Sequence, residues 1–390
     1  MYIIVDNASA NKSALEWLVS KMNKSASYQQ ILSGKYMHVR CTAHITNLIV
    51  GHGLKRLQKS VLAIRNAVKF VRSSANRLDI FKKTVEREKL PCKGLVCLDV
   101  PTRWNNTYLM LEVALKFKKA FTVMAEDEDS NFANYFKELD EEYDEDGNLV
   151  PSKNKRNRVG PSEVGDWEKA EVFVEFLKVF YDVTLRVSTS LHPTIHTTFH
   201  DVITMEKNMF LAPEIAKGSK TEKILMDMAT NMRSRWLKYY GSFHDINHMI
   251  IIGLVLDARF KLKNMTHIFQ TEGLRRTFEI KTLLLALYDK YVLVVDGGRH
   301  LQRQQSPSSS SSTVTSTSSR GGVRGQLLNN WKKVVEESSE AVIAHEVDQY
   351  LDAPWDPTDD KDCFDILCWW KINGYKFLVL ATIARDVLGI

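Results

Sequence analysis

The stretch Tyr2-Ile3-Ile4-Val5-Asp6-Asn7-Ala8-Ser9-Ala10-Asn11 decides how the fold begins. Its apolar, β-branched opening is typical of a strand, and the small polar residues after it end that strand. Ser13 to Met22 then has helical spacing, with Leu15, Leu18 and Val19 on one face. The pattern predicts a strand, an acidic tip at Asp6 and a helix. Because α/β proteins place functional side chains at the carboxyl ends of strands, Asp6 is a candidate site residue.

Two later pieces have a related character. Arg40-Cys41-Thr42-Ala43-His44 places Cys41 and His44 one helical turn apart, although two ligands alone do not indicate a structural zinc site. Residues 94–100 form a second candidate strand, which Pro101 and Thr102 end, and residues 103–117 are predicted to be helical. From its place at this junction, Trp104 is expected to be buried.

Composition sets the broad class. The 390 residues leave room for two or three domains, and 44% hydrophobic content permits a sizeable core. A net charge of +6 is compatible with nucleic acid without proving it. Five scattered cysteines argue against a disulfide framework and favour a reducing compartment. No apolar run approaches the roughly 20 residues of a membrane span, and no charged-then-apolar leader opens the chain, so we expect no membrane and no secretion.

A basic amphipathic helix follows the Cys–His piece. Its apolar seam consists of Leu54, Leu57, Val61, Ile64, Val68 and Val71. Its other faces carry Lys55, Arg56, Lys59, Arg65, Lys69 and Arg72, and Asp79 is the only acid between Leu54 and Lys83. A solvated helix and a phosphate-facing surface are about equally favoured interpretations.

The middle of the chain contains a polar segment and then a series of helices. Glu126 to Asp146 is strongly acidic and is expected to be a mobile, solvated loop, and the basic cluster from Lys153 to Arg158 could be a nuclear-import signal. The predicted helices start at Trp167 and continue over residues 194–209, 221–240, 249–256 and 278–295.

Two features within these helices have a structural and a functional interpretation. His192, His196 and His200 are four residues apart, and we favour a polar stripe between packed helices over a metal site. Asp257 and Arg259 are expected to form an N-cap and an ion pair, and Asp257 is not expected to be a catalytic acid.

The last part of the chain follows a low-complexity segment. Residues 306–319 are nearly all Ser and Thr and are expected to be a disordered linker that isolates a C-terminal module. In that module Trp369 and Trp370 are adjacent, so on a helix they differ by about 100°. We therefore predict that one Trp packs inward and the other contributes to a partner surface. The alternative is that both fill a local core.

Five motifs in this order resemble the hAT superfamily of DNA transposases, in particular its plant sleeper-type members. The matching strings are Val5 to Asn11, Arg40 to His44 with Asn47-Leu48, Thr102 to Asn105, Leu256 to Leu262, and Asp365 to Lys371 with Ala384 to Asp386. The family usually has Pro where Ala258 and Leu378 stand. The resemblance implies a ribonuclease-H-like catalytic core, interrupted by a helical insertion, and a C-terminal dimerisation module.

The resemblance also implies roles for single residues. Family members hold two divalent metals, Mg²⁺ or Mn²⁺, with three acids, and Asp6 stands where the second acid belongs. His44 corresponds to a residue near the cleaved phosphate, and Arg103 with Trp104 to a pair that steadies a flipped base. The first acid belongs before Met1 and the third beyond Ile390, so we expect a truncated site without a bound cofactor. The family's N-terminal zinc finger is expected to be absent as well.

These inferences give a mainly α-helical fold with a small α/β part. We expect a partial ribonuclease-H-like core over residues 1–124, a flexible loop over 125–165, a helical insertion over 166–300, a disordered linker over 301–326 and a dimerisation region over 327–390. In the ribonuclease-H-like order, Tyr2–Val5 and Leu95–Asp99 should pair as parallel neighbours.

The function that follows is a nuclear, DNA-binding, transposase-derived protein. It is expected to form a dimer with itself or with related hAT proteins through Trp369 and Trp370, and to lack cleavage activity. One alternative is a fragment of an active transposase that uses two-metal cleavage and strand transfer. Another is a protein–protein dimerisation partner only.

Overall fold

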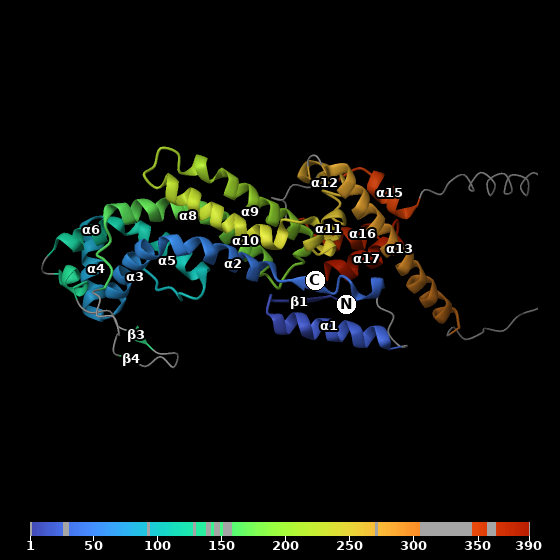
Figure 1. Ribbon diagram of the computed structural model, residues 1–390, viewed down its shortest axis with the longest axis horizontal. Coiled ribbons are helices and arrows are strands. Elements are labelled where there is room, and N and C mark those ends of the chain that lie inside the picture. The colour runs from blue at the N-terminus through green and yellow to red at the C-terminus, as the bar shows by residue number, and fades with distance from the viewer. Residues whose placement is uncertain are drawn as a thin grey trace, which may run out of the picture.

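The computed structural model describes residues 2–25, 31–91, 94–127, 130–137, 142–143, 149–150, 158–269, 272–304, 345–356 and 364–389. The protein is an elongated, mostly helical body with a small sheet along one side (Figure 1). The first helices are α1 (Ser9–Lys24), α2 (Thr42–Leu54), α3 (Gln58–Arg72), α4 (Ala75–Arg87), α5 (Trp104–Lys116), α6 (Lys118–Glu126) and α7 (Phe132–Tyr135). The later helices are α8 (Val164–Val187), α9 (Ile195–Ile215), α10 (Glu222–Tyr240), α11 (His248–Val255), α12 (Lys263–Phe269), α13 (Gly273–Gln304), α15 (Glu346–Asp352), α16 (Ile366–Asn373) and α17 (Leu378–Leu388). Short 3₁₀ turns are η1 (Ile31–Gly34), η2 (Lys55–Leu57) and η4 (Phe243–Asp245).

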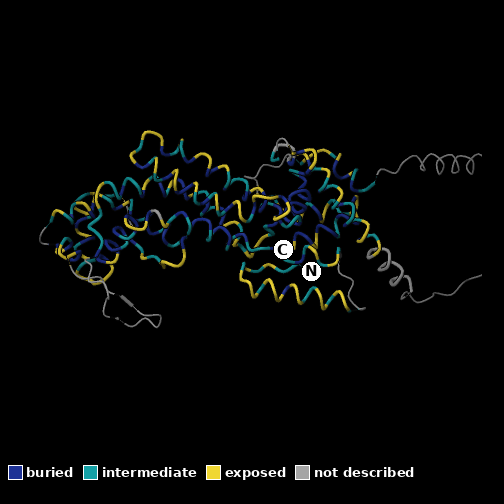
Figure 2. The backbone as a smooth tube through the Cα atoms, in the orientation of Figure 1, coloured by how far each residue is buried: buried dark blue, intermediate teal, exposed yellow. Residues whose placement is uncertain are grey.

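The predicted strand–tip–helix unit at the start of the chain is present. Strand β1 (Ile3–Val5) pairs in parallel with β2 (His38–Arg40), and Ile4 lies opposite Val39. The pairing continues at both ends, because the Ile3 amide donates to the Met37 carbonyl and the Cys41 amide donates to the Val5 carbonyl. Helix α1 lies along this sheet, with Leu15 buried and most of its outer face exposed (Figure 2).

The predicted pairing of Tyr2–Val5 with Leu95–Asp99 is wrong. Strand β1 pairs with β2, and residues 94–100 form no strand in the part of the chain described here. The physical reason lies at Asp99, whose carboxylate accepts hydrogen bonds from Arg65 of α3 and Thr107 of α5. These bonds fix the segment against the helical body.

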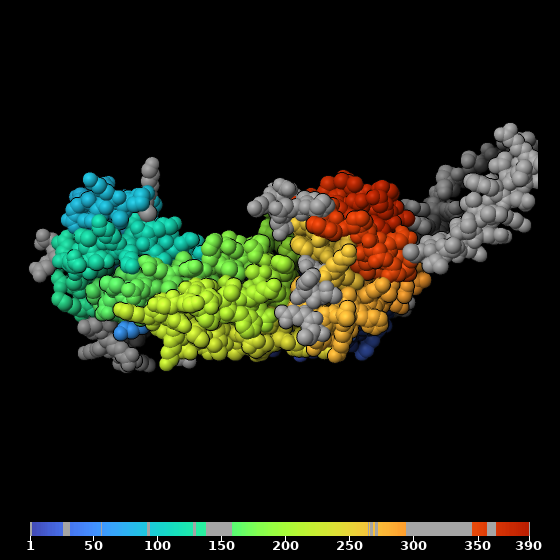
Figure 3. All heavy atoms as spheres, turned by 90° about the horizontal axis from the view of Figure 1, so that it is seen from above, coloured from blue at the N-terminus to red at the C-terminus, as the bar shows by residue number. Residues whose placement is uncertain are grey.

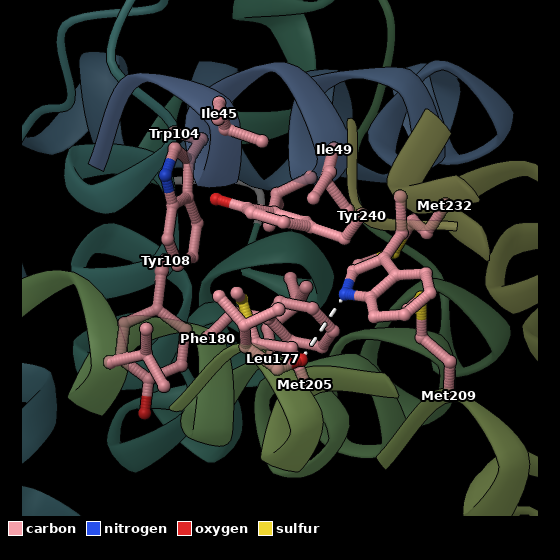
Figure 4. Packing of buried hydrophobic residues seen from close by; sticks show 14 of the residues in the cluster. Ile45, Ile49, Trp104, Tyr108, Leu177, Phe180, Met205, Met209, Met232 and Tyr240 are labelled. Carbon is pink, nitrogen blue, oxygen red and sulfur yellow. Dashed lines mark hydrogen bonds between the residues drawn. The ribbon is translucent and has the colours of Figure 1, made fainter. Parts of the chain in front are cut away.

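A helical bundle forms the main core. Its most extensive helix contacts join α2 to α10, α9 to α8, α10 and α11, and α5 to α8. The predicted seam of α3 is confirmed, because Val61, Ile64, Val68 and Val71 are all buried. Gly53 of α2 allows a close approach to α10, since a Cβ there would lie 2.5 Å from Cγ of Met232. Figure 4 shows the same interface from within, where Ile45 and Ile49 of α2 face Tyr240 and Met232.

The acidic region is only partly the solvated loop that was expected. Phe132 in α7 and Phe136 after it are buried, with Phe132 packed against both Phe70 and Phe136. These aromatic rings supply the apolar area that holds residues 130–137 to the bundle. The guanidinium of Arg158, from the predicted import signal, lies 4.2 Å over the Tyr135 ring, while residues 151–157 lie outside the described part. Strands β3 (Glu142–Tyr143) and β4 (Leu149–Val150) pair in antiparallel fashion.

The C-terminal module is joined directly to the helical body. The Trp370 indole donates to the Leu256 carbonyl at 2.9 Å, and the buried Tyr350 hydroxyl donates to the Val255 carbonyl at 3.0 Å. The ammonium of Lys261 donates to the carbonyls of Tyr350 and Ala353, at 2.8 and 2.7 Å. The expectation of an isolated module is therefore wrong for the described residues. The Ser-rich segment, residues 306–319, lies outside them.

The turn after α11 explains the Asp257–Arg259 motif. Both side chains are almost completely buried, and the guanidinium and carboxylate are 2.7 Å apart. The predicted ion pair is confirmed. Asp257 also accepts from the Arg259 amide, which makes it a turn residue, whereas α12 begins only at Lys263. The predicted N-cap role is therefore wrong.

The sheet and the last helix meet on one side of the body. The Tyr2 hydroxyl donates to the sulfur of Met249 in α11, and Tyr291 of α13 donates to Asp386 of α17 at 2.8 Å. Burial, together with the negative charge of Asp386, raises the pKa of Tyr2 to about 12. Figure 1 shows both chain ends at this place. Among the described residues, none of the helices has the length and apolar character required to cross a bilayer.

Candidate nucleic-acid interface

Asp6 lies at the carboxyl end of β1, where the sequence placed it. Its Oδ1 accepts hydrogen bonds from the Ala8 amide at 2.9 Å and from the Asn11 side chain at 2.6 Å. These two bonds, with a smaller contribution from the charge of His44, hold the pKa of the exposed Asp6 carboxyl below its usual value. The geometry shows Asp6 organising the turn into α1. This was the structural interpretation of the residue.

The Cys–His piece lies beside this turn. Cys41 precedes α2, and His44 is in the first turn of that helix. The described residues contain no group of three or more His, Cys, Asp or Glu side chains that could hold a metal ion. Two-metal chemistry needs several carboxylates around both ions, so the described residues do not fit such a centre. The histidines at 192, 196 and 200 do not form a metal cluster either, and the His200 ring stacks on Phe260.

Trp104 is a core residue in this structure. Only 4% of it is exposed, and its ring packs edge-on against Tyr108 at a centroid distance of 6.4 Å. Figure 4 shows Trp104 between α2 and α5, close to Ile45. An indole in this position cannot stack on a base unless it leaves the core. Arg103 is exposed just before α5 and caps no helix with its side chain.

The basic region keeps four of its predicted phosphate-binding side chains exposed. They are Lys55 in η2 and Lys59, Lys69 and Arg72 in α3. None of them forms an ion pair with another described residue. Because α3 buries its apolar seam, Lys59, Lys69 and Arg72 lie on its solvent-facing side, and Lys55 lies just before the helix. Such a surface favours binding of a polyanion.

Arg65 has a different role from the one predicted. Its guanidinium forms a two-pronged ion pair with Asp99, with Nε–Oδ1 and Nη2–Oδ2 distances of 2.8 and 2.6 Å. The side chains are 16% and 1% exposed, so this pair is largely removed from solvent. Arg65 therefore connects α3 to the segment before α5. The side chain of Arg56 lies outside the described part.

The two C-terminal tryptophans behave differently, as expected from their positions on a helix. Trp370 is 5% exposed and packs inward, which confirms that half of the prediction. Trp369 is half-buried, and its indole donates to Asp356 at 3.0 Å. Three exposed apolar residues of the module lie at or beside the turn between α16 and α17: Ile372, Tyr375 and Leu378. Leu367 and Trp355 are exposed elsewhere in the module.

Sequence reasoning did not find a cavity of about 370 Å³ beside β2. Lys35 and Arg40 contribute positive charge to its lining, and the C-terminal end of α10 and the start of α11 form the opposite wall. Its residues come from positions 35–45 and 239–250, and no local motif connects these two segments. The packing of α2 against α10 and the hydrogen bonds from Asn247 to the carbonyls of Tyr36 and His38 bring them together.

Comparisons with known proteins agree with this architecture. Residues 39–150 match the ZBED1 RNase-like helical domain, and residues 346–390 match the hAT family C-terminal dimerisation region. The chain is 28% identical over 371 residues to the zinc finger BED domain-containing protein RICESLEEPER 2 of Oryza sativa subsp. japonica, covering 92% of this chain and 46% of that protein. It is 25% identical over 393 residues to the putative AC transposase of Zea mays, covering 99% of this chain and 43% of the relative.

A third relative is the zinc finger BED domain-containing protein DAYSLEEPER of Arabidopsis thaliana, 24% identical over 310 residues. That match covers 80% of this chain and 37% of the relative. The chain thus spans less than half the length of these three relatives. The two family matches, the motif order and the helical architecture lead to one conclusion: the chain is a hAT-type, transposase-derived protein.

Proposed function

We propose that this protein binds DNA as a dimer in the nucleus and does not itself cut DNA. The observation that carries DNA binding is the set of four exposed cations, Lys55, Lys59, Lys69 and Arg72, which have no ion-pair partner among the described residues. Cations held on a rigid helical surface neutralise phosphates and release condensed counterions. The positions of Arg65 and Trp104 argue against a role in phosphate or base contacts for these two residues.

A salt series tests this proposal. Affinity for duplex DNA should fall linearly on a logarithmic scale with salt, with a slope of about −0.9 for each phosphate contacted. Replacing the four cations by Gln should therefore make the slope shallower by about 3 to 4. The matched control replaces Lys24, Lys207, Lys220 and Lys290 by Gln, which removes the same charge from exposed sites elsewhere. Equal slopes for the two variants would refute the proposed surface.

The absence of cleavage is proposed because Asp6 is engaged in its turn. No described carboxylates join it in a three-ligand cluster. We expect no nicking of supercoiled DNA with added Mg²⁺ or Mn²⁺. Nicking that Asp6→Ala abolishes would instead support the alternative of an active transposase fragment.

The proposed dimer uses the exposed turn between α16 and α17. Ile372, Tyr375 and Leu378 are 63%, 72% and 50% exposed, within seven residues of sequence. Apolar residues clustered in this way are typical of interaction sites, and they belong to the segment that matches the dimerisation region. The sequence analysis placed the dimer contacts at Trp369 and Trp370, but Trp370 is buried in the fold.

A further inference from the structure

The cavity beside β2 has the charge of an anion site. Lys35 and Arg40 line it with fixed positive charge, and Asp245 is the one carboxylate in its lining. His38 and Arg40 flank the core residue Val39, so strand alternation places both on the face opposite the core. Asn247 donates to the carbonyls of Tyr36 and His38, which fixes the position of this wall.

One polar atom in the lining lacks a partner. Nε2 of His38 is buried and accepts or donates no hydrogen bond within the described residues. Burial, followed by the charges of Arg40 and Lys12, lowers the pKa of His38. In the tautomer that carries its proton on Nε2, this atom can donate a hydrogen bond to a ligand oxygen.

Aromatic rings complete the cavity. Tyr36 and Tyr239 line it, and His248 lies 5.7 Å from the Tyr36 ring between centroids. The volume of about 370 Å³ is at the low end for ligand sites, which suits one small planar group with a charged substituent. Stacking on aromatic rings next to a basic groove is the usual way in which proteins hold single nucleotides of a strand.

We propose that this cavity binds one nucleotide unit of a DNA strand, with the phosphate held by Lys35 and Arg40. The base lies against Tyr36, Tyr239 or His248, and Nε2 of His38 receives a polar contact from the same nucleotide. This proposal rests on the proposed DNA-binding function and adds a second contact point to it.

Helix α2 connects the two contact points. Arg40 lies two residues before the start of α2, and Lys55 directly follows its last residue. Thirteen helical residues span about 20 Å, which corresponds to the rise of about six base pairs of duplex DNA. A DNA end bound on the basic surface could therefore place an unpaired nucleotide in the cavity.

Photocrosslinking tests the proposal directly. A single-stranded oligonucleotide that carries 5-iodouracil is irradiated with the full chain, and the crosslinked peptides are identified by mass spectrometry. We expect crosslinks at Tyr36, Tyr239 or His248. The double variant Lys35→Gln with Arg40→Gln should bind this oligonucleotide about tenfold more weakly or worse and lose the crosslinks. Lys290→Gln is the control and should change neither.

The two proposals fail in different ways. If replacing Lys55, Lys59, Lys69 and Arg72 by Gln leaves the salt slope unchanged while the cavity crosslinks are retained, only the basic surface is refuted. Crosslinks confined to that surface, with Lys35→Gln and Arg40→Gln without effect, would refute only the cavity. Thymidine monophosphate that binds as tightly as the oligonucleotide would show that the ligand is a free nucleotide and would overturn the DNA assignment. Circular dichroism of each variant checks that it is folded.

Discussion

At the scale of single residues, Asp99 shows how burial and hydrogen bonding compete at one carboxyl group. Burial alone raises its pKa, but the hydrogen bonds from Arg65 and Thr107 and the charge of Arg65 outweigh this effect. The net pKa is lower than usual, so the carboxylate is the form that the folded protein stabilises. Arg65 is thereby committed to the fold, although its sequence context resembled that of a DNA-binding residue.

Asp99→Asn should destabilise the protein by about 3 kcal/mol, because it leaves the Arg65 guanidinium largely buried without its counter-charge. Because the pKa of Asp99 is lowered in the folded state, the stability that its carboxylate contributes is fully present above the unfolded-state pKa of about 3.9. This stability is lost as the pH falls through the folded-state pKa. The difference in unfolding free energy between the two proteins should therefore be constant above about pH 5 and shrink below about pH 4. Urea titrations across this range measure it.

The exposed pair of Asp79 and Lys83 is the matched control. Asp79→Asn should have no measurable effect on stability at any pH, because solvent screens that pair. Equal effects of the two substitutions would contradict the role given to Asp99.

At the scale of elements, the crossing of α2 and α10 depends on one glycine. A Cβ at Gly53 would lie 2.5 Å from Cγ and 2.7 Å from Sδ of Met232, whereas a Cβ at Gly51 meets nothing within 4 Å. Both residues belong to α2, so they differ mainly in what they face. This crossing also positions the walls of the cavity beside β2.

Gly53→Ala should destabilise the protein by about 1–3 kcal/mol, because the helices must separate or Met232 must leave its rotamer. Gly51→Ala should stabilise it by up to about 1 kcal/mol, because alanine favours the helix and the site has space. Thermal unfolding followed by circular dichroism compares the two variants with the parent chain. A stabilising Gly53→Ala would show that the helices are less closely packed than described.

The sequence predicted the features that a local pattern decides, and it did not predict those that long-range packing decides. Helix α3, the strand at Ile3–Val5 and the inward position of Trp370 follow from periodicity, which is a local property. The partner of β1, the ion pair of Arg65 and the burial of Trp104 depend on residues tens of positions away. The cavity beside β2 could not be predicted for the same reason, since its two walls are about 200 residues apart in sequence.

At the scale of the whole molecule, the basic surface and the exposed C-terminal turn lie on separate parts of an elongated body. Figure 3 shows the C-terminal helices at one end, with α11 to α13 beside them, and the segments from α4 to α6 at the other end. The C-terminal module is fixed to the body through Lys261, Tyr350 and Trp370. A dimer formed through that module would therefore hold two basic surfaces at a set distance.

Tyr375→Asp should weaken this dimer by a factor of about 30 or more, since a buried aromatic anchor commonly contributes at least 2 kcal/mol. Light scattering over a concentration series measures the dissociation constant. Leu191→Asp is the control, because Leu191 is 82% exposed in the loop between α8 and α9 and outside the proposed interface. A parent chain that is monomeric at micromolar concentration would contradict the dimer proposal.

The meeting of Tyr2 with the region of Tyr291 and Asp386 has a consequence for the order of folding. The bundle from α2 to α10 ends at Tyr240, so it can form while the rest of the chain is still being synthesised. Strand β1 is synthesised before the bundle, yet its surroundings are complete only after residue 386 has emerged. Until then, the edge of the sheet and the apolar faces of α11 and α13 remain uncovered. The nascent chain is therefore most exposed to aggregation late in synthesis, and a chaperone would act at this stage.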